Sequence, residues 1–124
     1  MRNAGFAVLI LAATGLRTQA AEQKLSTDEI KQAFTGNSVH GQWGDTEYYS
    51  FFDGDGSTSY TTKTSTDWGR WAAAHGQYCS KWQMSGESCY DIFRDGDKII
   101  WVAPASGKHY GSTLLTGKPA PKFP

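Results

Sequence analysis

Two different spacings of hydrophobic residues divide the chain. Within residues 25–34 the apolar side chains recur at helical spacing, which predicts a short helix with one face to bury. Ser26 and Glu29 stand three residues apart at its start, as in a capping box, and Gly36 just past its end is a typical stop. Such a helix must pack on another element, because most helical stability in proteins comes from burying the apolar face.

From residue 39 onward, short runs of aromatic and β-branched residues are separated by Gly, Asp and Ser, a pattern typical of consecutive hairpins. It predicts eight strands, near residues 39–43, 46–52, 57–63, 67–73, 76–83, 88–94, 98–103 and 109–115. We therefore expect a mainly β fold. In it, the short N-terminal helix packs on an antiparallel meander of about seven or eight strands, which forms a small barrel or a strongly bent sheet.

The strand predicted at 46–52 has aromatic residues on both faces, namely Tyr48, Tyr49, Phe51 and Phe52. Either the N-terminal helix covers the second face of this strand, or that face lines a ligand site. We expect the helix to cover it, because the helix needs a place to dock and large apolar patches seldom stay exposed.

The first 20 residues have the features of a secretory signal peptide. Arg2 supplies a positive charge, and residues 4–16 form an uncharged, largely apolar run. Small residues at Thr18 and Ala20 predict cleavage after Ala20. The run is shorter than the roughly 20 residues that a membrane-spanning helix needs, so we expect no stable membrane insertion and a periplasmic or secreted location.

Cleavage would leave 104 residues, enough for one domain with its own core. We assign residues 21–117 to a single β-rich domain and residues 118–124 to a flexible Pro-rich tail. The mature chain would have 10 basic and 12 acidic residues, a formal net charge of −2. Because the basic residues form no cluster, this composition argues against nucleic acid as a partner. Separately, we expect the protein to be a monomer.

Cys79 and Cys89 are the two cysteines of the chain, and in an exported protein of this size such a pair predicts a disulfide. A metal site would need further ligands at close spacing, and no histidine lies within three residues of Cys79 or within ten of Cys89. If the two cysteines face each other on neighbouring strands, Tyr78 lies opposite Tyr90.

Asp95-Gly96 adds a second indication of register, as a two-residue hairpin turn that would place Ile92 opposite Ile99. The turn and the cysteine pair assign the same side chains to one buried face. These are Tyr78, Trp82, Tyr90, Ile92, Ile99 and Trp101.

Motifs for catalysis or metal binding are incomplete. The Asp-Gly run at 53–56 lacks the later carboxylates of a calcium loop, which leaves a hairpin turn as the better interpretation. His40, His75 and His109 are far apart in sequence, and no G-x-S-x-G segment occurs. We therefore assign no catalytic residue, no metal and no cofactor.

All five tryptophans follow residue 40, and rings of this kind either fill the core of a small β domain or line a pocket. As candidate ligand-binding residues we select four: Trp43, Tyr48, Trp71 and Trp82.

At residues 41–43 the tripeptide Gly-Gln-Trp, after a short helix and at the start of the first long strand, resembles the beginning of a lipocalin-type (calycin) barrel. More of the chain resembles a domain family of unknown function found in short exported alphaproteobacterial proteins. The shared segments are FTGNS at 34–38, YSFFDGDG at 49–56, GRW at 69–71, YCSKW at 78–82, CY at 89–90 and GKP at 117–119. This resemblance implies a compact barrel and a periplasmic location, and it brings no known catalytic residues.

We expect a periplasmic, non-catalytic binding module for a small molecule, an envelope component or another protein. Two other classes stay open, a small periplasmic hydrolase or metal-dependent enzyme and a structural envelope protein. A pocket among the aromatic residues would favour ligand binding, whereas a filled core would favour contact with another protein.

Overall fold

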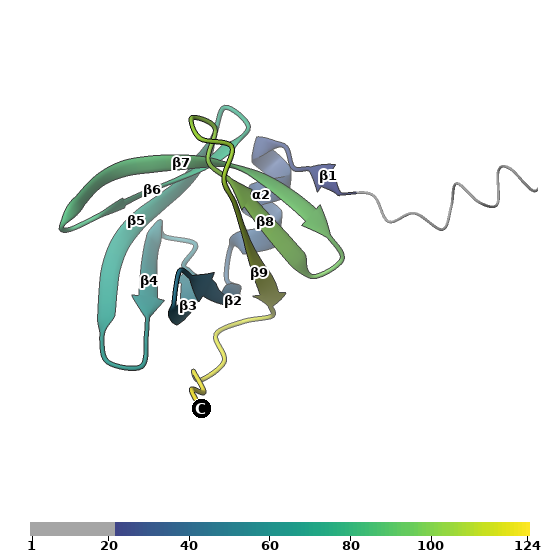
Figure 1. Cartoon of the computed structure of the whole chain (residues 1–124). Coiled ribbons are helices and arrows are strands. Elements are labelled where there is room, and N and C mark those ends of the chain that lie inside the picture. Colours follow the sequence, from purple (N-terminus) through teal and green to yellow (C-terminus); the bar gives the residue numbers. More distant parts are fainter. Residues whose placement is uncertain (1–21) are drawn as a thin grey trace, which may run out of the picture.

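A computed structural model describes residues 22–124, which form one helix and nine strands (Figure 1). The elements are β1 (Gln23–Lys24), α2 (Thr27–Phe34), β2 (Ser38–Trp43), β3 (Thr46–Phe52), β4 (Ser57–Thr61), β5 (Thr66–Ala74), β6 (Gln77–Trp82), β7 (Ser85–Asp95), β8 (Lys98–Val102) and β9 (His109–Leu115). The predicted helix and all eight predicted strands are present, and the two-residue β1 was not predicted. The predicted signal peptide lies outside the described residues.

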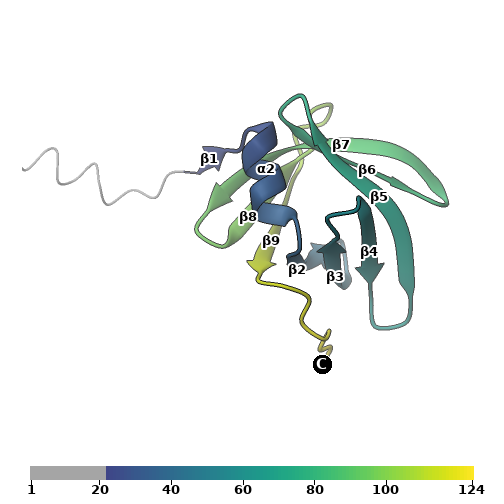
Figure 2. The same ribbon diagram turned by 180° about the vertical axis from the view of Figure 1, so that it is seen from behind.

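Strands β2 to β9 form a closed, antiparallel meander barrel. Each strand pairs with the next along the chain, and β9 returns to pair with β2, where Ser38 lies opposite Leu115. The fold class predicted from the sequence is therefore confirmed, with the barrel closed. The first half of β7 pairs with β6 and its second half with β8, so the β6–β7 hairpin projects beyond β8 and away from α2 in both views (Figures 1 and 2).

Helix α2 lies across one end of the barrel. Its start is the predicted capping box, since the Ser26 hydroxyl accepts from the Glu29 backbone N–H (3.2 Å) and the Glu29 carboxylate accepts from the Ser26 N–H (2.8 Å). Its last residue, Phe34, is fully buried and stacks on Phe52 with 4.7 Å between ring centroids. The Thr27 hydroxyl accepts from a backbone N–H in the β5–β6 turn, and this hydrogen bond fixes the start of the helix against that turn.

The predicted register is confirmed for the β6–β7 hairpin and is wrong for the β7–β8 hairpin. Cys79 lies opposite Cys89 as expected, but Ile92 lies opposite Trp101 instead of Ile99. The reason is that Gly96, with φ of 62°, is the first of the two turn residues and not the second, an arrangement typical of a type II′ turn. The pairing shifts by two positions, so the predicted buried face is unchanged.

The second aromatic face of β3 is covered by the C-terminal tail, so the expectation that the helix covers it is wrong. The Tyr49 hydroxyl donates to the backbone carbonyl of Lys122 (3.2 Å), and the Lys118 ammonium lies 4.9 Å from the Phe51 ring centroid. The helix cannot cover this face, because Phe34 and the other apolar residues of the helix are buried at the end of the barrel. The flexibility of residues 118–124 stays a prediction.

Candidate functional site: an aromatic cavity in the barrel

A cavity of about 360 Å³ lies inside the barrel, at the end opposite α2. Its wall is mostly aromatic, and its outer residues come from the ends of β2, β6 and β7. The residues that line it are Val39, Trp43, Tyr48, Ser50, Phe52, Tyr60, Asp67, Tyr78, Ser80, Trp82, Gln83, Met84, Ser85, Ser88, Tyr90 and Trp101. The barrel is therefore filled by side chains at the helix end and hollow at the other.

Three of the four residues predicted to bind a ligand meet at this cavity: Trp43, Tyr48 and Trp82. Trp71 is not among its lining residues. It is buried beside Phe52 at the closed end, with ring centroids 5.6 Å apart, and its indole N–H donates to the backbone carbonyl of Asp53 (2.9 Å). Trp71 therefore belongs to the core that holds the β3–β4 turn against β5.

The inner wall of the cavity is built from buried tyrosines and Trp101. Tyr48 stacks on Tyr60 at 4.8 Å, and Tyr78 meets the Trp101 ring edge-on at the same distance. Burial raises the pKa of both Tyr48 and Tyr78 far above the ordinary value. These phenols therefore stay protonated at physiological pH and act as neutral hydrogen-bonding groups.

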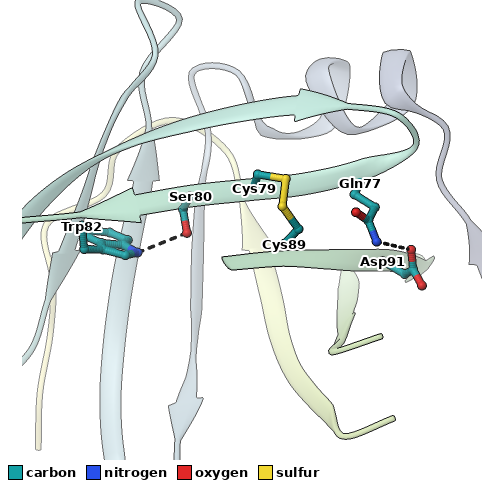
Figure 3. Close-up of a disulfide and its surroundings, with 6 residues drawn as sticks. All are labelled: Gln77, Cys79, Ser80, Trp82, Cys89 and Asp91. Carbon is teal, nitrogen blue, oxygen red and sulfur yellow. Dashed lines mark hydrogen bonds between the residues drawn. A yellow bond between two sulfur atoms is a disulfide. The ribbon is translucent and has the colours of Figure 1, made fainter. Parts of the chain in front are cut away.

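The mouth of the cavity is formed by more exposed rings. Trp43 is 41% exposed, stacks on Tyr110 at 4.1 Å and meets the edge of Tyr90 at 6.2 Å. Across the mouth, the Trp82 indole N–H donates to the Ser80 hydroxyl (3.1 Å; Figure 3). These contacts hold both indole rings in fixed orientations beside the opening.

Gly69 explains how Trp82 fits against β5. A Cβ atom at Gly69 would lie 2.7 Å from the Trp82 ring and 2.6 Å from the backbone carbonyl of Lys81. The indole therefore rests on bare backbone, next to the irregular pairing between Lys81 and Trp82. Any side chain at this position would push the Trp82 ring out of its place in the cavity wall.

The polar groups of the cavity are few. Besides the tyrosines, its polar lining residues are four serines, Ser50, Ser80, Ser85 and Ser88, together with Gln83 and Asp67. Among the described residues that line the cavity there is no lysine, arginine or histidine. Asp67 lies opposite Tyr60 in the β4–β5 ladder, and the pKa of Tyr60 is raised by burial and, to a smaller extent, by the negative charge of Asp67.

Sequence analysis missed several members of this wall. Tyr60, Asp67 and Tyr90 join the predicted residues because they alternate onto the inner face of their strands. Tyr60 and Asp67 lie at equal distances from the observed turn at 62–65, whereas the predicted strands 57–63 and 67–73 placed that turn at 64–66. What the sequence does not show is that the barrel interior is hollow at this end.

The three histidines lie apart. His40 on β2 pairs with the Glu47 carboxylate (2.6 Å), His75 is in the β5–β6 turn at the helix end, and His109 begins β9. Within residues 22–124 no group of three His, Cys, Asp or Glu side chains is placed to hold a metal ion.

The Asp-Gly run at 53–56 forms the turn between β3 and β4. The Asp55 carboxylate accepts from the backbone N–H and hydroxyl of Ser57, and these hydrogen bonds lower the pKa of Asp55. The Asp53 carboxylate accepts from the Asp55 N–H (3.1 Å). Both carboxylates thus stabilise their own turn, which agrees with the hairpin-turn interpretation.

The predicted disulfide is present between Cys79 on β6 and Cys89 on β7 (Figure 3). It lies between Ser80, which faces the cavity, and the hydrogen bond from Gln77 to Asp91 (3.2 Å). The bridge therefore ties together the two strands of the projecting hairpin that carries Trp82. No helix within the described part of the chain is long and apolar enough to cross a membrane.

No family model, curated protein or solved structure matches the chain. The architecture itself is an eight-stranded antiparallel barrel with one short helix across an end, which is compatible with a calycin-type fold.

Proposed function

We propose that this protein is a periplasmic binding module whose barrel cavity takes a small, largely apolar molecule. The cavity carries this proposal, because it combines an open mouth, walls of tryptophan and tyrosine and a few hydroxyl groups. Concave, mostly apolar sites with few polar groups are the usual form of small-molecule binding sites. Trp43, Tyr48 and Trp82 are the predicted residues that would contact the ligand.

The chemistry of the wall supports binding over catalysis. Serine hydroxyls need a neighbouring base to act as nucleophiles, and no histidine or lysine is among the described residues of the wall. The buried phenols of Tyr48 and Tyr78 have raised pKa values and are poor bases at neutral pH. Catalysis by a pair of carboxylates needs one acid and one base, and Asp67 is the only carboxylate among the described residues of the wall.

The periplasmic part of the proposal rests on two observations. Residues 1–20 have the pattern of an export signal, and the disulfide between Cys79 and Cys89 is of a kind that persists in oxidising compartments. Mass spectrometry of the periplasmic fraction would test this, with an intact disulfide and an N-terminus at Ala21 as the expected result.

Binding can be tested with N-phenylnaphthylamine, an uncharged aromatic dye whose fluorescence rises in apolar surroundings. We expect saturable binding to the purified mature chain, weakened at least about fivefold by Trp82→Ala, because one ring contact contributes ~1 kcal/mol. Trp68→Ala is the matched control, since Trp68 is 57% exposed and lies outside the cavity. Equal loss of binding in both variants, or no binding by the folded wild type, would refute the proposal.

A further inference from the structure

The cavity has an unusual balance of charge, which points to one class of ligand. Eight aromatic rings line it: Trp43, Tyr48, Phe52, Tyr60, Tyr78, Trp82, Tyr90 and Trp101. The face of each ring carries partial negative charge, so a group of such rings attracts cations. Nothing positive opposes this attraction within the described wall, which holds no lysine, arginine or histidine.

Asp67 adds a full negative charge at the same place. Asp67 is an exposed residue of the cavity lining, lies opposite Tyr60 in the β4–β5 ladder, and in the described chain takes part in no ion pair. The Tyr60 ring in turn lies 6.1 Å from the Trp82 ring. A carboxylate without a counterion thus shares the cavity lining with these two rings.

Lys63, four residues before Asp67, and Lys118 both have other partners. Lys63, in the turn that follows β4, donates to the backbone carbonyl of Pro124 (3.3 Å). Lys118 lies over the rings of Phe51 and Trp68, at 4.9 and 5.9 Å, on the outer face of the barrel. Lys118 therefore supplies a cation to the outer aromatic face, whereas no lysine, arginine or histidine is among the described residues that line the cavity.

From this arrangement we infer that the ligand of the cavity carries a positive charge, as an amine or quaternary ammonium group, held among the aromatic rings near Asp67. This inference rests on the proposed function and specifies its ligand class. The volume of about 360 Å³ limits the ligand to a small molecule, and the aromatic wall favours an apolar or aromatic body behind the cationic group. An anionic ligand would meet the negative ring faces and the Asp67 carboxylate with no compensating charge.

Two probes of almost identical shape separate charge from size. Benzyltrimethylammonium carries a quaternary nitrogen where neopentylbenzene carries a neutral carbon. Each is titrated into the mature wild-type chain and followed by tryptophan fluorescence and by displacement of N-phenylnaphthylamine. We expect the cation to bind at least about tenfold more tightly, as cation–π contacts in a partly desolvated site predict.

Asp67→Asn tests the role of the carboxylate without changing its size. We expect it to weaken binding of the cation about threefold at low salt, in the range of exposed charge pairs, and to leave binding of neopentylbenzene unchanged. Asp97→Asn is the matched control, because it removes the same charge from the β7–β8 turn at the other end of the barrel.

The outcomes distinguish this inference from the proposed function. If the dye binds and neopentylbenzene competes as well as the cation, the cavity binds small molecules but the inferred ligand class is wrong. If neither probe nor the dye binds to folded protein, both are wrong. An equal effect of Asp67→Asn and Asp97→Asn would overturn the placement of the cation near Asp67, whereas selective weakening by Asp67→Asn supports it.

Discussion

The two ends of this barrel are built from the same kinds of residue and differ in what fills them. At one end Phe34 of α2 packs against Phe52, and further contacts with Trp71, Tyr78 and Trp101 leave it fully buried. At the other end Trp43 and Trp82 stand at the rim of a cavity. Aromatic residues therefore form a packed core where a helix supplies a further ring, and a pocket where none does.

This difference also separates stability from binding. Residues at the closed end contribute mainly to the free energy of unfolding, because truncating them leaves a void in a packed interior. Residues at the open end already border empty space, so truncating them should affect binding more than folding. The following predictions test this division, beginning with the largest expected effect.

Phe34→Ala should lower the free energy of unfolding by about 3–5 kcal/mol, because it removes a fully buried ring from the closed end. Trp43→Ala, at the partly exposed mouth, should lower it by ~1 kcal/mol or less. Urea denaturation of both variants checks this. Similar losses in the two variants would contradict the division between the two ends.

Replacing both Cys79 and Cys89 by serine should lower the free energy of unfolding by about 2–3 kcal/mol, as expected for the short loop that the disulfide closes. The bridge lies in the hairpin that carries Trp82, so amide hydrogen exchange should rise more in β6 and β7 than in β2 and β3. A uniform rise over all strands would show that the disulfide does not act locally on the mouth.

Alkaline pH should destabilise the fold from about pH 10 upward. Burial raises the pKa of Tyr48 and Tyr78 above the ordinary value of 10.0, so the unfolded chain loses these protons first and the fold loses stability as pH rises. Below the ordinary value this contribution is fully present. Tyr78→Phe should flatten the dependence, measured as denaturation midpoints between neutral and alkaline pH; an unchanged slope would assign the effect to other groups.

Ser26→Ala should have a small effect, a loss of about 1 kcal/mol, because it removes the hydrogen bond from the Glu29 backbone N–H to the N-cap hydroxyl. Ser26→Asp restores an acceptor and should recover most of the stability. Thermal denaturation of both variants measures the difference. Neither variant should change dye binding, since α2 lies at the closed end.

Local signals were sufficient to predict every element of this fold except the two-residue β1. The capping box at Ser26, the stop at Gly36 and the punctuation between strands each depend on a few adjacent residues, and all are present in the structure. The disulfide could be predicted because two cysteines and a predicted export signal leave few alternatives. The β7–β8 turn shows the limit, because Asp95-Gly96 and Gly96-Asp97 both suit a two-residue turn. The predicted type I′ turn would need positive φ at both Asp95 and Gly96, whereas the observed turn needs it at Gly96 alone.

The candidate site depends on long-range packing and was predicted only in part. Trp43, Tyr48 and Trp82 line the cavity, but the Trp71 ring lies inward at the closed end, where Phe34 occupies the space beside it. Likewise, nothing local to Tyr49 and Phe51 indicates that the chain's last residues will cover them. The space that a helix or tail fills depends on the whole fold. It cannot be predicted from the alternation of apolar and polar residues along one strand.

The closing contact between β2 and β9 has a consequence for how the protein folds. Ser38 pairs with Leu115, so the barrel cannot close until residues 38–115 have all been made. Pairings between distant parts of a chain form slowly, because the entropy lost in closing the loop is spent before the contacts form. The export signal predicted at residues 1–20 would fit this order of events, since a polypeptide that has not yet closed into a barrel can still be threaded through a translocation channel.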